Sequence, residues 1–203
     1  MPVPQAVVFD LGKVLLEFDY GKAAAKIAQR GRLGAPEVRA FIDQSPLLFR
    51  YETGSMTKED FYSQVSSFTG FAGSITEFSH IFGDIFEPII PMIELHGHLR
   101  KNKVPTFIFS NTNELAISHI KATYPFFNEF DGYVFSYEHG AMKPTPKLYD
   151  AVESLTGKRR DEILYLDDRA ENIEAGAKRG WQVILHETAA VTVAEVRASG
   201  LLE

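Results

Sequence analysis

The sequence contains no cysteine. Disulfide bonds, thiol chemistry and zinc sites built from cysteine ligands are therefore excluded. No apolar run is long enough to span a bilayer. The opening residues, MPVPQAVVFD, carry no basic region and too short an apolar run for a signal peptide, so we expect a cytoplasmic protein.

Positive charge is also scarce. The chain has 21 lysine and arginine residues and 27 aspartate and glutamate residues, which gives a formal net charge of −6. A negative net charge argues against nucleic acid or an anionic membrane as the main partner. It does not exclude a small anionic substrate, because a metal ion and one lysine can neutralise such a substrate locally.

The chain has 203 residues, of which 45% are apolar, and it contains no repeat or low-complexity tract. This is enough for one domain with a real core, or for one domain with an insertion. Nothing in the composition fixes the oligomeric state, and a monomer and a homodimer are both compatible with it.

Five short segments rich in β-branched and aromatic residues are typical of buried strands. They are residues 7–9, 106–109, 133–135, 163–166 and 181–185. Helix signals follow between the last four: Asn113 is a candidate N-cap, and Thr145 precedes a first-turn proline. Gly157 and Gly180 are candidate helix stops. Alternating strands and helices indicate an α/β fold, with a parallel sheet covered by helices on both faces.

The interval between the first two strands is far longer than one crossover needs. It carries helical patterns near residues 23–28, after Pro36, after Thr57 and over residues 78–85, and we expect no strand between Phe18 and Pro88. We expect Phe61, Val65 and Phe68 to form the inner face of one of these helices. The predicted division is a core of residues 1–17 and 88–203, with a helical cap of residues 18–87 over the carboxyl edge of the sheet, where ligands bind in such folds.

Four polar segments end or closely follow predicted strands. They supply the candidate site residues Asp10, Ser110, Asn111, Lys143, Asp167 and Asp168. Two adjacent carboxylates at the end of a buried strand repel each other unless a cation or a proton intervenes. A hard, oxygen-seeking ion such as Mg²⁺ satisfies that requirement.

Together these residues predict a phosphoryl-transfer site. A carboxylate that attacks a phosphate meets a repulsion of about 4 kcal/mol per charge pair at 4 Å and an effective dielectric near 20. A divalent ion removes this repulsion, and Lys143 adds a positive charge beside the transferring group. Attack by Asp10 would give an aspartyl phosphate, which water must then hydrolyse.

The order of these residues resembles the four motifs of the haloacid dehalogenase superfamily. The phrases DLGKVL, SNTNE, SYEHGAMKPTPKLY and LDDRAENIEAG are similar to its branch with a helical cap, and YETGSMTKEDF resembles the cap of that branch. The resemblance is especially close to bacterial sugar-phosphate phosphatases of the glucose 1-phosphatase type. A more distant similarity is to the phosphatase domain of soluble epoxide hydrolase.

The resemblance implies a Rossmann-like sheet with an all-helical cap inserted after the first strand. It also implies a role for each candidate residue. Asp10 would be the nucleophile and, with the Gly12 carbonyl and Asp168, a ligand of Mg²⁺. Asp167 would act on the metal directly or through water. Ser110 and Asn111 would hold the phosphate, and Lys143 would bridge the phosphate and Asp10.

One departure from the family pattern concerns proton transfer. Most phosphatases of this superfamily carry a second aspartate two residues after the nucleophile, as the acid for the leaving group, and this chain has Gly12 there. The glucose 1-phosphatase branch also tends to have glycine at this position. Either the leaving group departs as an anion, or another group supplies the proton. The nearby candidates in the sequence are Glu17, Asp19, Glu138 and His139, and in the cap Glu52; Tyr51 and Glu52 are also candidates for contacting the substrate.

Three functions are compatible with these residues. The first is a Mg²⁺-dependent phosphatase of a small phosphorylated metabolite, for which a sugar phosphate such as glucose 1-phosphate is the best single candidate. The second is a low-activity or non-catalytic binder of phosphorylated ligands. The third is a dehalogenase, which would also use Asp10 but needs no metal, so that the pair of Asp167 and Asp168 would be unnecessary.

Overall fold

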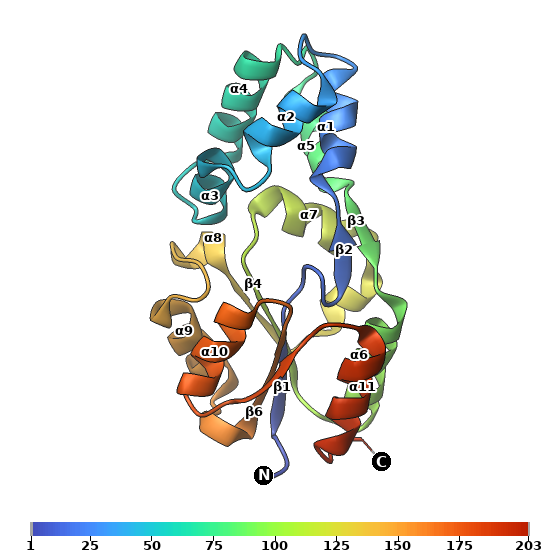
Figure 1. The fold of residues 1–203 in the computed structure, drawn as a ribbon, viewed down its shortest axis with the longest axis vertical. Helices are drawn as coiled ribbons and strands as arrows, with labels where there is room; N and C mark the ends of the chain where they lie inside the picture. Colours follow the sequence, from blue (N-terminus) through green and yellow to red (C-terminus); the bar gives the residue numbers. More distant parts are fainter. Residues whose placement is uncertain (1, 203) are drawn as a thin grey trace.

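In the computed structural model, which describes residues 2–202, five parallel strands form one sheet in the order β5–β4–β1–β6–β7 (Figure 1). The strands are β1 (Ala6–Phe9), β4 (Thr106–Ser110), β5 (Gly132–Phe135), β6 (Ile163–Asp167) and β7 (Gln182–Leu185). The five strands predicted from the sequence are therefore confirmed, with ends that differ by one residue at most. β1 is central and pairs with β4 and β6, so the residue after it lies in the middle of the carboxyl edge.

Helices cover both faces of the sheet, as the sequence predicts. Successive side chains of β1 point to opposite faces. Val7 and Phe9 belong to one buried cluster, and Ala6 and Val8 belong to the other. The helices that follow the cap are α6 (Ile90–Lys101), α7 (Glu114–Thr123), α8 (Ser136–His139), α9 (Pro146–Thr156), α10 (Ala170–Lys178) and α11 (Ala189–Ala198), with short 3₁₀ turns at Pro125–Glu129 and Arg160–Glu162. Within residues 2–202, no helix is long and apolar enough to cross a membrane.

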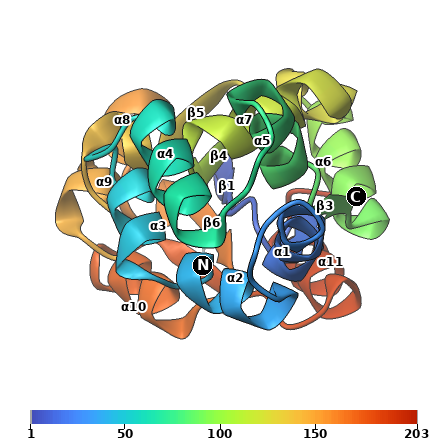
Figure 2. The same ribbon diagram turned by 90° about the horizontal axis from the view of Figure 1, so that it is seen from above.

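The long interval after β1 forms a bundle of short helices that stands over the carboxyl edge of the sheet (Figures 1 and 2). Its helices are α1 (Tyr20–Ala28), α2 (Ala35–Ile42), α3 (Pro46–Glu52), α4 (Lys58–Thr69) and α5 (Ile75–Gly83). They enclose their own hydrophobic cluster, centred on Phe61, Phe78 and Phe82. Where the cap begins and ends as a domain stays a prediction.

Two details of this segment differ from the sequence prediction. Residues Leu16–Phe18 (β2) and Phe86–Pro88 (β3) form an antiparallel ribbon, so a strand does occur where none was expected. Segments of three residues are too short to display the alternation that marks a strand. Phe68 is 44% exposed and does not join the inner face, because its ring stacks on Phe41 at the surface.

Helix α7 connects the two parts of the molecule. It begins after Asn113, whose side chain accepts a hydrogen bond from the Ala116 amide, as the sequence predicts. Leu115 packs into the cluster of the helical bundle, whereas Ala116, Ile117 and Ile120 pack against the sheet. One helix therefore contributes to both hydrophobic cores.

Gly54 lies at a close contact between the bundle and the core. It follows α3 with φ +66°, and a Cβ atom at this position would lie 2.1 Å from the carbonyl oxygen of Tyr137 in α8. Only glycine lets the two segments approach this closely without a shift.

We expect Gly54→Ala to destabilise the protein more than Gly157→Ala. Gly157 has φ +65°, but a Cβ there meets nothing within 4 Å. Gly157→Ala should therefore cost about 1–2 kcal/mol, which is the left-handed backbone penalty alone. Gly54→Ala carries the same penalty and must also push α3 away from α8. Urea unfolding of both variants measures the difference, and equal losses would contradict this contact.

Candidate active site

The candidate residues predicted from the sequence meet at the carboxyl edge of the sheet. Asp10 follows β1, Ser110 ends β4 and Asp167 ends β6, and these three strands are neighbours. The register places Phe9 opposite Leu166, so Asp10 and Asp167 come next to each other. Lys143 reaches the same point from the loop before α9.

The Lys143 ammonium group is enclosed by oxygen atoms. Its Nζ lies 2.9 Å from Asp10 Oδ1 and 2.7 Å from Asp167 Oδ2, and it donates to the Phe109 carbonyl at 2.9 Å. The Lys143 side chain is 1% exposed. The second donor to Asp10 Oδ1 is the Leu11 amide, at 2.7 Å. The nucleophile predicted from the sequence is thus held in a fixed orientation by two donors.

Burial and neighbouring charges have opposite effects on the pKa values of Asp10, Asp167 and Lys143. Burial raises the pKa of Asp10 to about 7, although Lys143 lowers it. For Asp167 burial also opposes ionisation, but Lys143 outweighs it and lowers the pKa of that carboxyl. Burial pulls the pKa of Lys143 down, and the charges of Asp10 and Asp167 together raise it. The lysine is therefore a fixed cation, and Asp167 is its ionised partner.

Asp167 is completely buried and accepts hydrogen bonds on both oxygens. Besides Lys143, its donors are the Tyr165 hydroxyl, the Arg169 amide at 2.8 Å, and Asn172 Nδ2 at 2.9 and 3.1 Å. Neutral donors of this kind stabilise a buried carboxylate. In this arrangement Asp167 anchors Lys143, and a direct contact with a metal stays a prediction.

Asp168 completes an acidic cluster. One carboxylate oxygen from each of Asp10, Asp167 and Asp168 can be chosen so that all lie within 4.8 Å of one another. Asp168 is partly exposed, and burial together with the charge of Asp167 raises its pKa. Three carboxylates around one lysine leave an excess of negative charge. Oxygen donors in this number suit a hard divalent cation such as Mg²⁺.

Ser110 and Asn111 lie beside Lys143 at the end of β4. The Asn111 side chain accepts from the Lys143 amide at 2.7 Å and donates to the Lys143 carbonyl at 3.2 Å. Its side chain therefore holds the lysine loop. The donors of Asn111 that are left for a phosphate are the second Nδ2 hydrogen and the backbone amide. The Ser110 hydroxyl is buried and makes one long hydrogen bond, 3.3 Å, to the Asn111 carbonyl.

At Gly12, where most family members carry an acid, the space is filled by an aromatic ring. A Cβ atom on Gly12 would lie 2.9 Å from Cε1 of Phe18, on strand β2. An aspartate at this position would require the Phe18 ring to move.

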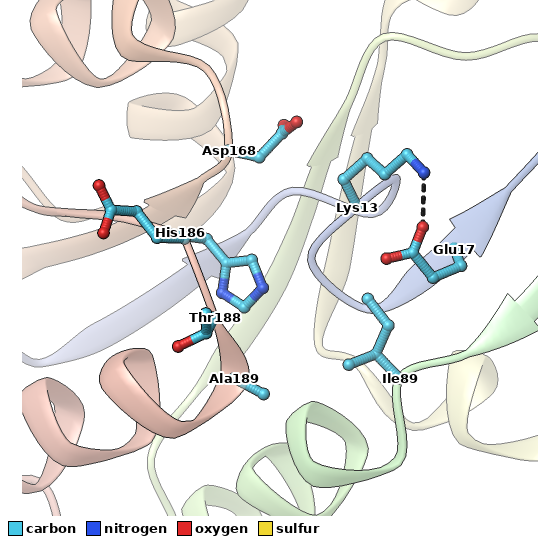
Figure 3. Close-up of a pocket in the computed structure, with 8 residues that line it drawn as sticks. Lys13, Glu17, Ile89, Asp168, His186, Thr188 and Ala189 are labelled. Atoms are coloured by element: carbon cyan, nitrogen blue, oxygen red, sulfur yellow. Dashed lines mark hydrogen bonds and ion pairs between the residues drawn. The ribbon is translucent and has the colours of Figure 1, made fainter.

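A cavity of about 440 Å³ opens beside Asp168 (Figure 3). Lys13 and Glu17, which form an exposed ion pair, line one side, and His186 lines another. The Nδ1 atom of His186 lies 2.7 Å from the Thr192 hydroxyl. Sequence reasoning did not single out His186, although it directly follows strand β7 and the rule that selected Asp10 would have selected it.

The other residues considered from the sequence have separate roles. Asp19 caps helix α1 by accepting from the Gly21 amide at 2.7 Å. Tyr51 is buried against Phe61, and its hydroxyl accepts from the Leu115 amide at 3.3 Å.

The side chains of Glu138, His139 and Glu52 differ in how far they are exposed to solvent. Glu138 is exposed and accepts from the Tyr137 hydroxyl, and His139 is partly buried at the end of α8. Glu52 is partly buried under the helical bundle.

The two adjacent aspartates should differ in their contribution to stability. Asp167→Ala leaves Lys143, Tyr165 and Asn172 with unpaired buried groups, so we expect a loss of about 3–5 kcal/mol of unfolding free energy. Asp168→Ala, at a partly exposed position, should cost less than about 1 kcal/mol. Denaturant unfolding without added metal measures both. Similar losses would contradict the anchoring role of Asp167.

Comparisons with known proteins agree with this arrangement. The profile of haloacid dehalogenase-like hydrolases matches residues 4–180. A D-ribitol-5-phosphate phosphatase from Bacteroides thetaiotaomicron is 25% identical over an alignment of 193 residues, which covers 91% of this chain and 92% of the relative. A sesquiterpene phosphatase from Aspergillus oryzae is 26% identical over 186 residues, or 91% of this chain and 90% of the relative.

Solved structures show the same fold. A HAD family enzyme from Bacteroides thetaiotaomicron, in complex with magnesium and inorganic phosphate, has a TM-score of 0.76 at 19% identity and covers 89% of this chain and 93% of that one. At this identity the likeness concerns the fold alone. The profile match extends over most of the chain, and the chain belongs to the haloacid dehalogenase-like hydrolase family.

Proposed function

We propose that this protein is a Mg²⁺-dependent phosphatase that hydrolyses the phosphate monoester of a small cytoplasmic metabolite. The observation that carries the proposal is the position of Asp10. Its carboxylate is oriented by Lys143 at 2.9 Å and by the Leu11 amide at 2.7 Å, beside the carboxylates of Asp167 and Asp168. This is a nucleophile with a fixed cation on one side and an acidic cluster on the other.

Each site residue has a separate role in the proposed reaction. Asp10 attacks phosphorus and forms an aspartyl phosphate, as the leaving oxygen departs. Lys143 keeps the nucleophile oriented and neutralises charge on the transferring group. Ser110 and Asn111 donate to phosphoryl oxygens. Asp10, Asp168 and the Gly12 carbonyl would hold Mg²⁺, which when bound would offset the repulsion between carboxylate and phosphate.

The best single candidate for the substrate is a sugar phosphate, such as glucose 1-phosphate. One relative that matches nearly the full chain is a D-ribitol-5-phosphate phosphatase, which favours a polyhydroxylated leaving group. The relative from Aspergillus oryzae is a sesquiterpene phosphatase, so similar chains also act on apolar leaving groups. A panel of phosphorylated metabolites tested against the purified protein identifies the class.

A second candidate function follows from Gly12. With no carboxylic acid there and Phe18 in its place, the chain could bind phosphorylated ligands without turnover. Hydrolysis of p-nitrophenyl phosphate with Mg²⁺ and with EDTA decides between the two. Turnover that EDTA abolishes supports the phosphatase. Absence of turnover under both conditions supports the binder, and metal-independent halide release from a haloacid would indicate a dehalogenase.

Replacement of the nucleophile is the first test. We expect Asp10→Asn to abolish phosphatase activity, because an amide of the same volume cannot attack phosphorus. Circular dichroism should show an intact fold. Residual activity above a few per cent, which corresponds to a loss of only about 2 kcal/mol, would rule out Asp10 as the nucleophile.

Metal activation provides an independent test. We expect Asp168→Asn to raise the Mg²⁺ concentration for half-maximal activity by about 10 to 100-fold or more. Asp167→Asn should shift this concentration less and instead lower the rate at saturating Mg²⁺, since its carboxylate anchors Lys143. A larger shift in the Asp167 variant would reverse the two roles.

A further inference from the structure

The proposed reaction needs a proton at the leaving oxygen, and Gly12 cannot supply it. The Phe18 ring occupies the space of the missing side chain. Phe18 packs edge-on against Tyr20, with ring centroids 5.8 Å apart. The Tyr20 hydroxyl in turn lies 3.5 Å from Oε1 of Glu52. The rings of Phe18 and Tyr20 therefore lie between the vacant acid position and a carboxyl group of the helical bundle.

The other carboxyl groups considered at this edge are already committed. Glu17 forms an exposed ion pair with Lys13, and Asp19 caps α1. Glu138 is exposed to solvent. All three side chains are exposed, whereas Glu52 is partly buried.

The backbone of Glu52 is fastened to the segment that holds the phosphate-binding candidates. The Ser136 hydroxyl donates to the Glu52 carbonyl at 2.6 Å and accepts from the Thr112 amide at 2.9 Å. Thr112 lies two residues after Ser110. Two residues after Glu52, Gly54 packs on the Tyr137 carbonyl, where α3 stands over α8 (Figure 1). Glu52 is thus held over the carboxyl edge of the sheet.

The surroundings of this carboxyl group favour its protonated form. It faces Tyr20 of α1, Asp43 at the end of α2 and Asn113 at the start of α7. Among residues 2–202, no lysine, arginine or histidine forms an ion pair with it. Burial raises the pKa of Glu52 to about 7, Tyr20 and Asn113 lower it, and Asp43 raises it. Burial also raises the pKa of Tyr20, which stays neutral.

We propose that Glu52 is the general acid that protonates the leaving oxygen, in place of the acid absent at Gly12. This inference rests on the proposed phosphatase function. As the bond from phosphorus to the leaving oxygen breaks and the bond to Asp10 forms, the Glu52 carboxyl proton passes to the leaving oxygen, which departs as an alcohol. The Glu52 carboxylate then takes a proton from the water that hydrolyses the aspartyl phosphate. Glu52 is then protonated again, as it was before the reaction.

Glu52→Gln tests the proposal, because glutamine keeps the shape and the hydrogen bonding but has no acidic proton. Single-turnover rates are measured for p-nitrophenyl phosphate and for alkyl phosphates of increasing leaving-group pKa. General acid catalysis is typically worth about 10² to 10⁴-fold, so the variant should lose about that factor on alkyl phosphates. On the aryl ester, whose phenolate leaves without help, the loss should be less than about tenfold.

The pH dependence gives a second readout that a purely structural role would not change. For an alkyl phosphate, kcat/KM of the wild type should fall above about pH 7, as Glu52 loses its proton. Glu52→Gln should remove this alkaline decline, and Glu52→Asp should keep it. Glu138→Gln, which alters an exposed carboxyl group, should behave as the wild type in both measurements.

Three outcomes would overturn the proposal. Equal losses on aryl and alkyl esters in a folded Glu52→Gln variant would indicate a structural role. Wild-type rates in that variant would show that the residue is dispensable, and selective loss in Glu138→Gln would transfer the role to that residue. Failure of the proposed function is a separate result, since a non-catalytic binder would show no Mg²⁺-dependent turnover in the wild type with any ester.

Discussion

The buried ammonium group of Lys143 is the constraint on which the site depends. A buried charge requires partners that are held in place, and here the partners are carboxylates at the ends of two adjacent strands. Asp167 is fixed by Tyr165, Asn172 and a backbone amide, so it fixes Lys143. Lys143 then orients Asp10. The position of Asp10 therefore depends on the register of β1 and β6.

The candidate site as a whole has two electrostatic environments. Beneath the sheet edge, charges are paired, and the lysine stays ionised between two carboxyl groups. Above it, Glu52 lies among neutral groups and one further carboxyl, and burial raises its pKa to about 7. Attack and protonation would then belong to different parts of the chain.

Much of this arrangement could be predicted from the sequence. Five buried strand segments and their intervening helix signals define a parallel sheet, and the rule that strand ends converge at one edge brings Asp10, Ser110 and Asp167 together. These are local patterns combined with one general rule of topology. Asn113 as a cap and Gly157 as a helix stop are also local, because each acts on its own neighbours in the chain.

The remainder depends on contacts between distant segments. No local pattern says that Phe18 fills the space beside Gly12, or that the amide of Asn111 is used by Lys143. Phe68 has the spacing of an inner-face residue and is nevertheless exposed, since stacking on Phe41 depends on the packing of α2 against α4. The ribbon of β2 and β3 pairs segments that are about seventy residues apart in the chain. Each segment is too short to show the alternation of apolar and polar residues that marks a strand.

That ribbon has a consequence for the architecture. Leu16 pairs with Pro88, so the chain leaves and re-enters the sheet domain at hydrogen-bonded neighbours. Because the ribbon holds the two ends of this segment together, the number of residues between them adds little to the entropic cost of closing the loop. The bundle is therefore joined to the sheet through this one ribbon, and its other attachments include packing contacts such as Leu115 in its cluster and Gly54 against Tyr137. A change in the length of the bundle segment would alter what stands above Asp10 and leave the strand order of the sheet intact.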